Sequence, residues 1–265
     1  FITVFILVFT IPFIINYETS LTNKKPATTF ASDVNVLIYD GEGSSTDSVD
    51  GLIYCLEEAN KNNYNINFVY STADVINSDV LSSQDVLIIS GGDIELLFND
   101  PTISPADIKA FVREGKGYLG ICAGAYVASN YQGEYGSGWG ISPHINATYT
   151  DYDGQLPLTI TSYGINTLKY SDCDIFVFNK YCGKNIDQMT IPSFPMSNTP
   201  ALYKNGNYSS IAIYADNNSF LDGYAAILDD TYGSGRIILS GPHPELDPAK
   251  PELVARMVAW VSKKI

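Results

Sequence analysis

The chain has 265 residues, 45% of them hydrophobic, which is long enough for one well-packed domain preceded by a leader. It carries 15 Lys and Arg residues against 29 Asp and Glu residues, a formal net charge of -14. Such an acidic chain repels phosphate backbones and anionic membrane surfaces, so we do not expect nucleic acid as a partner. No repeat, charge run or Pro-rich tract interrupts residues 33–265, which we interpret as one domain.

The chain begins with an apolar run, FITVFILVFTIPFII. As a helix it would cover about 22 Å, less than the roughly 30 Å hydrocarbon core of a membrane, which suits a signal peptide. We interpret residues 1–17 as a signal peptide or an N-terminal membrane anchor and residues 18–32 as a polar linker; a buried N-terminal helix or strand is the alternative. We therefore expect the protein to be extracellular, or membrane-anchored and facing outside, with membrane contact only through this segment. Three Asn-x-Ser/Thr triplets agree with export, at Asn146, Asn207 and Asn217.

Four cysteines do not make a disulfide framework for a chain of this size. In an oxidising compartment Cys173 and Cys182 could close a short loop, and the sequence leaves this pairing open. Cys55 lies in an apolar pattern of helical spacing, so we expect it to be a buried residue. The remaining cysteine, Cys122, lies between a predicted buried strand and a predicted helix.

Strand and helix patterns alternate in the first half of the chain. In chain order, we predict a strand at residues 34–39, a helix at 47–60, strands at 66–70 and 85–90, a helix at 105–114 and a strand at 117–121. Apolar strands separated by helices predict a parallel sheet that is covered on both faces.

Beyond residue 129 the pattern changes to period-two patches, which predict antiparallel strands at residues 209–215, 224–228 and 236–240. A hairpin turn at residues 233–235 would join the last two strands. A helix is predicted at residues 251–264, with basic residues at its end. The expected fold is therefore α/β, with three layers, a mostly parallel central sheet, flanking helices and an antiparallel extension.

A nucleophile elbow is predicted at residues 117–126, GYLGICAGAY, where a buried strand runs into small residues and then a helix. Cys122 stands at the junction, and Gly120 and Gly124 leave room for the strand and the helix to approach each other. The positive end of the helix would favour a thiolate, and the N–H of Ala123 would point at a forming oxyanion. The alternative is a core cysteine in an ordinary strand-to-helix turn.

Paired glycines follow another buried strand, in residues 90–93, SGGD. Glycines let the backbone approach a ligand closely, so we assign the N–H of Gly92 as a second oxyanion donor and place Gly91 in the substrate pocket. The alternative meaning of Gly-Gly is a tight turn.

A histidine and a carboxylate lie two residues apart in residues 239–245, LSGPHPE. In extended backbone such residues project the same way, so Glu245 can orient the imidazole of His243, which can then take the proton of Cys122. The only other histidine, His144, lacks this context. With two histidines and no Cys pair at ligand spacing, no zinc site and no cofactor are predicted.

These motifs resemble the class I glutamine amidotransferase-like superfamily, in which a Gly-x-Cys-x-Gly elbow is followed far downstream by His-Pro-Glu. Residues 120–124 and 243–245 match both motifs in order and spacing, and residues 91–92 fall where the oxyanion loop of that superfamily lies. Within it, the chain is most similar to the domain at the N-terminus of some biotin–protein ligases. The resemblance covers residues 33–265 and implies a flavodoxin-like, class I amidotransferase-like fold with a triad of Cys122, His243 and Glu245.

The sequence departs from this superfamily at Tyr126, because glutaminases usually carry Gln at that position to bind substrate glutamine. We place Tyr126 in the substrate pocket and do not expect free glutamine as the substrate. The leading hypothesis is an exported cysteine hydrolase acting on the C–N bond of a small amide or a peptide. The alternatives are a catalytically inactive binding module on the same fold and an amidotransferase subunit for an unseen partner. The sequence leaves the substrate and the oligomeric state open.

Overall fold

The computed structural model describes residues 32–62, 65–173, 180–215, 221 and 224–265. The predicted signal peptide or anchor, the sequon at Asn217 and almost all of the predicted linker lie outside these residues. Ser32, which the prediction placed in the linker, is instead the first residue of β1, because its N–H pairs with the carbonyl oxygen of Asn65 at 3.2 Å. In the described part of the chain, no helix has the length and apolar character needed to cross a membrane.

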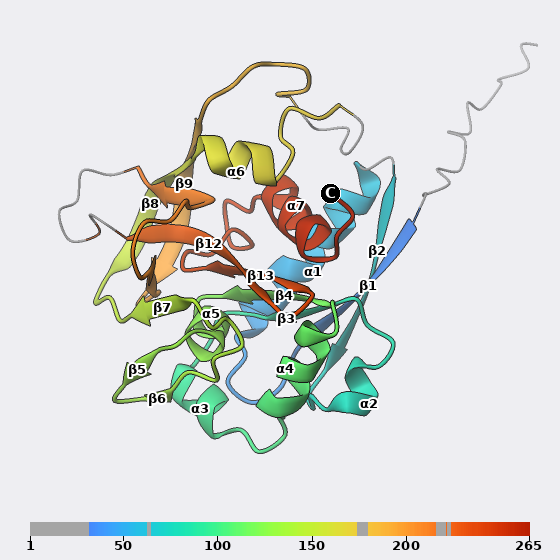
Figure 1. The fold of residues 1–265 in the computed structure, drawn as a ribbon, viewed down its shortest axis with the longest axis vertical. Coiled ribbons are helices and arrows are strands. Elements are labelled where there is room, and N and C mark those ends of the chain that lie inside the picture. Colours follow the sequence, from blue (N-terminus) through green and yellow to red (C-terminus); the bar gives the residue numbers. More distant parts are fainter. Residues whose placement is uncertain (1–31, 63–64, 174–179, 216–220, 222–223) are drawn as a thin grey trace, which may run out of the picture.

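The centre of the molecule is an eleven-stranded sheet with the strand order β2-β1-β3-β4-β13-β12-β11-β8-β9, to which β10 and β7 are added beside β12 (Figure 1). Strands β2, β1, β3, β4 and β13 run parallel, and the others pair antiparallel. β5 and β6 form a separate hairpin. The strands are β1 Ser32–Tyr39, β2 Ile66–Ala73, β3 Val86–Ile89, β4 Gly117–Ile121, β5 Gln132–Gly133, β6 Gly136–Ser137, β7 Ile145–Thr148, β8 Asp153–Ile160, β9 Met189–Ser197, β10 Ala201–Lys204, β11 Ala212–Tyr214, β12 Ala225–Tyr232 and β13 Gly235–Ser240.

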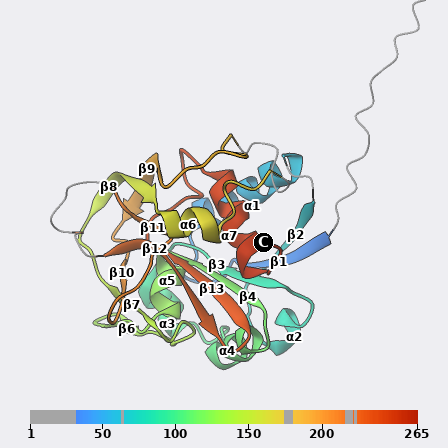
Figure 2. The same cartoon turned by 45° about the horizontal axis from the view of Figure 1, so that its top comes forward.

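Helices cover both faces of the parallel half, as the apolar strands predict (Figures 1 and 2). α1 and α7 lie together on one face, and α2 to α5 lie on the other. In β1, Val36 and Ile38 join the core under α1 and α7, whereas Leu37 and Tyr39 join the core on the opposite face, because strand side chains alternate. The helices are α1 Thr46–Lys61, α2 Ser78–Leu81, α3 Ile94–Asn99, α4 Pro105–Arg113, α5 Ala123–Ala128, α6 Ser162–Thr167 and α7 Pro251–Val261.

Three predictions for the second half need correction. β13 is antiparallel to β12, as expected for a hairpin that turns at Gly233, but it is also parallel to β4, because it returns into the centre of the sheet. The predicted strand at residues 209–215 shortens to β11, whose pairing with β12 is interrupted by a register shift. The last helix ends at Val261, so Lys263 and Lys264 lie beyond its last turn; Lys263 has a positive φ of 61°, which a helix cannot continue.

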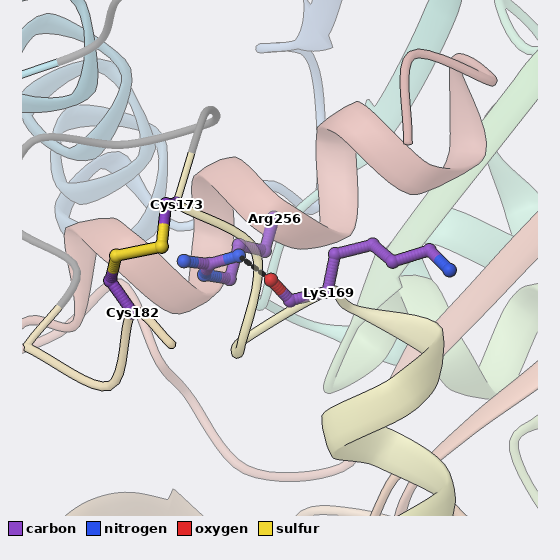
Figure 3. Close-up of a disulfide and its surroundings, with 4 residues drawn as sticks. All are labelled: Lys169, Cys173, Cys182 and Arg256. Carbon is purple, nitrogen blue, oxygen red and sulfur yellow. Dashed lines mark hydrogen bonds between the residues drawn. A yellow bond between two sulfur atoms is a disulfide. The ribbon is translucent and has the colours of Figure 1, made fainter. Parts of the chain in front are cut away.

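Cys173 and Cys182 form a disulfide, which answers the question left open by the sequence. Figure 3 shows this bridge near Arg256 of α7, whose side chain is fully buried. Arg256 donates to the carbonyl oxygens of Leu168 and Lys169, each at 2.9 Å, and so fastens the segment after α6 to α7. Cys55 is buried in α1 as predicted, and burial raises its pKa to about 12.

Candidate functional site

Cys122 lies where β4 ends and α5 begins, in a backbone conformation that L residues rarely adopt. Its φ is 49° and its ψ is -106°, a strained geometry of the kind that concentrates at functional sites. Its N–H donates to the carbonyl oxygen of Ser240 at 2.8 Å, and its own carbonyl accepts from Ala125 and Tyr126, each at 3.0 Å. These three bonds hold the sharp turn, so the predicted elbow geometry is present.

The two elbow glycines leave no space for a side chain. A Cβ on Gly120 would lie 2.5 Å from the carbonyl oxygen of Gly124, and a Cβ on Gly124 would lie 2.0 Å from that of Ile89. Both distances are far below van der Waals contact, so glycine is required at both positions for α5 to pack on β3 and β4.

His243 and Glu245 form a buried pair beside the elbow. Nδ1 of His243 lies 2.7 Å from Oε1 of Glu245, and the exposed fractions of these residues are 6% and 2%. Ser48, in the first turn of α1, donates to the same Oε1 at 2.6 Å and accepts the N–H of Gly91 at 3.0 Å. Among the described residues, the second oxygen of Glu245, Oε2, has no hydrogen-bond partner.

The surroundings of His243 favour its charged form. Burial is the largest influence on the pKa of His243 and lowers it, but the charges of Glu245 and Cys122 and hydrogen bonds to both side chains together raise it, to about 10. This direction favours the protonated imidazole, which has the carboxylate of Glu245 on one side and the thiol of Cys122 on the other. An imidazole in this arrangement can give a proton to a leaving group.

Two backbone N–H groups near Cys122 are available to an oxyanion. Ala123 is the first residue of α5, and Gly92 bridges to Ser44 so that its own N–H faces away from that partner strand. Neither N–H donates to any backbone or side-chain acceptor in the described part of the chain. The structure thus leaves unpaired the two donors that the sequence proposed.

Gly91 has a different place from the one predicted. It does not line the pocket next to Cys122 but lies against the imidazole, where a Cβ would come within 2.2 Å of Cε1 of His243. Gly91 therefore supports the imidazole of His243, and the absence of a side chain is what allows this contact.

A pocket of about 210 Å³ opens beside Cys122, and Tyr126 lines it as predicted. The hydroxyl of Tyr126 donates to the carbonyl oxygen of Asn198 at 2.9 Å, and burial raises the pKa of this tyrosine well above its ordinary value. The thiol lies 3.9 Å from the carbonyl oxygen of Ser197. The lining residues are Gly92, Asp93, Ile94, Cys122, Tyr126, Tyr135, Tyr149, Ser197 and Asn198.

Sequence reasoning missed Ser48 and the segment Ser197–Asn198. Ser48 occupies one position in an amphipathic helix, where a serine carries no signal of a distant carboxylate partner. Asn198 has a φ of 49° and follows β9, a strand that the sequence pattern did not predict. Only the three-dimensional packing brings these residues to Cys122.

His144 takes no part in this site. Its ring lies 2.8 Å from Asp230, whose carboxylate also accepts from Ser142 at 2.6 Å. Within the described residues, no group of three or more His, Cys, Asp and Glu side chains is placed to hold a metal ion.

Part of the chain matches a known protein family. Residues 34–138 match the family model described as "Biotin-protein ligase, N terminal". The matched residues run from β1 through the elbow, include Gly92, Cys122 and Ala123, and end before His243. No curated protein matches the chain.

Solved structures agree on the fold at low sequence identity. PurLQS from Thermotoga maritima is 14% identical, with 86% of this chain and 98% of that chain covered and a TM-score of 0.51. A ThuA-like protein from Bacteroides uniformis is 14% identical, with 89% and 94% covered and a TM-score of 0.53. The carbohydrate deacetylase Agd3 is 10% identical, with 87% of this chain but 32% of that chain covered and a TM-score of 0.54.

The resemblance stated from the motifs is therefore confirmed: the chain is similar to the class I glutamine amidotransferase-like superfamily and to the biotin-protein ligase N-terminal family. The predicted α/β class, with a mostly parallel central sheet and flanking helices, is confirmed as well.

We predict that Ser48→Ala lowers the free energy of unfolding by about 1–3 kcal/mol, because it leaves the N–H of Gly91 and a lone pair of Glu245 buried without a partner. Alanine is the better helix former, so a loss would identify the hydrogen bonds as its cause. Urea unfolding measures the change. Ser82→Ala, which removes an exposed hydroxyl bonded to Asp79, is the control and should stay within about 0.5 kcal/mol. Equal changes in both variants would contradict the structural role of Ser48.

The raised pKa of His243 predicts a pH dependence of stability. Between its ordinary pKa of about 6.5 and its folded value of about 10, the folded state binds a proton that the unfolded state has lost. This contribution is fully present below about pH 6.5 and disappears as the pH rises toward 10. Relative to His243→Gln, the wild-type free energy of unfolding should therefore fall by roughly 2–4 kcal/mol between pH 7 and pH 10. Parallel curves for the two proteins in urea titrations would show that the imidazole is not held as a cation.

Proposed function

We propose that the protein is an exported cysteine hydrolase that cleaves an amide C–N bond through Cys122, His243 and Glu245. The observation that carries this proposal is the strained elbow at Cys122 beside the buried His243–Glu245 pair, which are separated by more than a hundred residues in the sequence. The similarity in fold to the carbohydrate deacetylase Agd3 agrees with it. The roles of the individual residues and the export of the chain belong to the proposal.

In the proposed reaction the thiolate of Cys122 attacks the carbonyl carbon of the amide. The negative charge that forms on the oxygen is stabilised by the N–H groups of Ala123 and Gly92. The imidazolium of His243 gives its proton to the departing amine, and a thioester remains on Cys122. Water then attacks the thioester, His243 takes its proton, and the carboxylic acid leaves as the thiolate is restored. Glu245 orients the ring and stabilises its cationic form throughout.

The pocket argues against free glutamine as the substrate. Tyr126 stands where glutaminases usually carry Gln, and its hydroxyl already donates to the carbonyl oxygen of Asn198 at 2.9 Å. A tyrosine in this place removes the side-chain amide that would bind glutamine. We therefore propose another small amide or a peptide as the substrate.

Export is supported by chemistry inside the domain as well as by the apolar N-terminal run. The disulfide between Cys173 and Cys182 is typical of an oxidising compartment. Asn207 lies in an exposed bend, whereas Asn146 lies within β7. We therefore propose an extracellular protein, or one anchored to the membrane and facing outside.

A catalytically inactive binding module is the second candidate. It is favoured by the small exposed fraction of Cys122, 5%, and by the carbonyl oxygen of Ser197, 3.9 Å from the thiol, on the side where a substrate would approach. The two candidates differ in whether Cys122 can be acylated.

We expect p-nitrophenyl acetate to acetylate Cys122, because the elbow presents the thiol beside two oxyanion donors. Intact-protein and peptide mass spectrometry after an acid quench measure the adduct. Its formation should vanish in Cys122→Ala and slow by about 100-fold or more in His243→Gln, the usual contribution of a general acid–base group.

Cys55→Ala is the matched control, since Cys55 is fully buried in α1 and should not change the adduct. Acetylation of Cys122 at the same rate in His243→Gln, or no acetylation of Cys122 at all, would favour the binding module.

A further inference from the structure

The pocket beside Cys122 is lined by acidic and aromatic side chains but by no basic ones. Among its nine lining residues there is no Lys, Arg or His, one carboxylate, Asp93, and three tyrosines. A substrate with a carboxylate or phosphate group would find no cationic side chain among the lining residues, and the imidazole of His243 beside the thiol is buried and already paired with Glu245. A cationic group would find both a carboxylate and aromatic rings.

Asp93 is held in place at the edge of this pocket. Its Oδ1 accepts the N–H groups of Glu95 and Leu96, at 2.9 and 3.1 Å, as the N-cap of α3. The residue is exposed, and within the described part of the chain no ion pair involves its carboxylate. The carboxylate therefore stands on a residue that lines the pocket, without an ion-pair partner among the described residues.

A second carboxylate stands next to the pocket at Glu134. Glu134 directly precedes the lining residue Tyr135 in the chain, and a hydrogen bond to Glu134 together with its charge raises the pKa of Tyr135 to about 12. Glu134 is also exposed and has no ion-pair partner in the described part of the chain.

The three tyrosine rings of the pocket lie next to one another. The ring centroids of Tyr126 and Tyr149 are 6.4 Å apart with an interplanar angle of 31°, and those of Tyr135 and Tyr149 are 5.8 Å apart with an angle of 42°. The faces of aromatic rings attract ammonium and guanidinium groups. The tyrosine rings and the carboxylates thus both favour a cationic ligand. The chain's net charge of -14 adds to this preference at long range.

We propose that this pocket selects substrates that carry an ammonium or guanidinium group next to the bond that is cleaved. The inference names a substrate class for the proposed hydrolase, and the cleavage itself rests on that function. Binding of a cation does not depend on catalysis, so the preference of the pocket and the hydrolase function can be tested independently.

Three methanethiosulfonate reagents test the pocket, one neutral (methyl), one cationic (trimethylammonium-ethyl) and one anionic (sulfonatoethyl). The thiolate of Cys122 attacks the sulfenyl sulfur, a mixed disulfide forms and methanesulfinate leaves. Peptide mass spectrometry gives each rate at Cys122, divided by the rate of the same reagent with a small thiol. At low salt, the cationic reagent should react at least about tenfold faster than the anionic one, and added salt should reduce this ratio.

Variants locate the cause of the preference. Asp93→Asn keeps the helix cap, because Asn is as good an N-cap as Asp, and removes the charge. It should reduce the cation-to-anion ratio several-fold, as should Glu134→Gln, while Asp79→Asn, an exposed carboxylate of α2, should not. Equal normalised rates for the two charged reagents, or a ratio unaffected by Asp93→Asn, would overturn the inference.

A measurement without the thiol covers the case in which Cys122 proves unreactive. Cys122→Ser is titrated with tetramethylammonium chloride and with sodium methanesulfonate, and the ring resonances of Tyr149 are followed by NMR. Saturable shifts with the cation only, weakened in Asp93→Asn, would support the pocket even if the proposed hydrolase function fails. Shifts with neither ion, or with both equally, would overturn it.

Discussion

The buried pairing of His243 with Glu245 constrains the structure around the candidate site. Both groups are almost fully out of water, so the protein must supply the hydrogen bonds that water would have made. Ser48 supplies one of these bonds by donating to Oε1 of Glu245, whereas Oε2 has no partner among the described residues. Ser48 also accepts from Gly91, whose missing side chain lets the ring lie against the backbone. The pair therefore ties α1, the loop after β3 and the loop after β13 to one another, and the thiol of Cys122 lies on the remaining side of the imidazole.

The topology of the sheet brings these loops together. β3, β4 and β13 are parallel neighbours, so their carboxyl ends meet at one edge, and each is followed by a part of the site: the glycine pair, the elbow and the histidine loop. The antiparallel half contributes from the other side, since β9 leads into the Ser197–Asn198 segment that covers the pocket. The parallel strands thus position the candidate reactive groups, and the antiparallel extension supplies part of the lining of the pocket beside Cys122.

Much of this could be read from the sequence because the signals were local. The apolar strands, the Gly-x-Cys-x-Gly elbow and the His-Pro-Glu spacing each lie within a few residues, and their placement at strand ends follows from the general geometry of parallel sheets. Contacts between distant segments carried no such signal. Ser48 is an ordinary helix position, Gly91 was assigned to the pocket because nothing local reveals the imidazole above it, and β8 and β9 contain Gly, Pro and Ser that blur the strand period. The same limit applies to β13, whose hairpin was evident while its parallel partner β4 was not.

The central claim is that Cys122 and His243 act as one reactive pair, and the alkylation rate of Cys122 against pH tests it most directly. Iodoacetamide labelling is followed by peptide mass spectrometry in the native protein and in His243→Gln, with buried Cys55 as the internal reference. The account predicts fast labelling of Cys122 well below the ordinary thiol value of about pH 8.5 and a marked slowing in His243→Gln. A Cys122 that stays unreactive, or that labels identically in the two proteins, would contradict it.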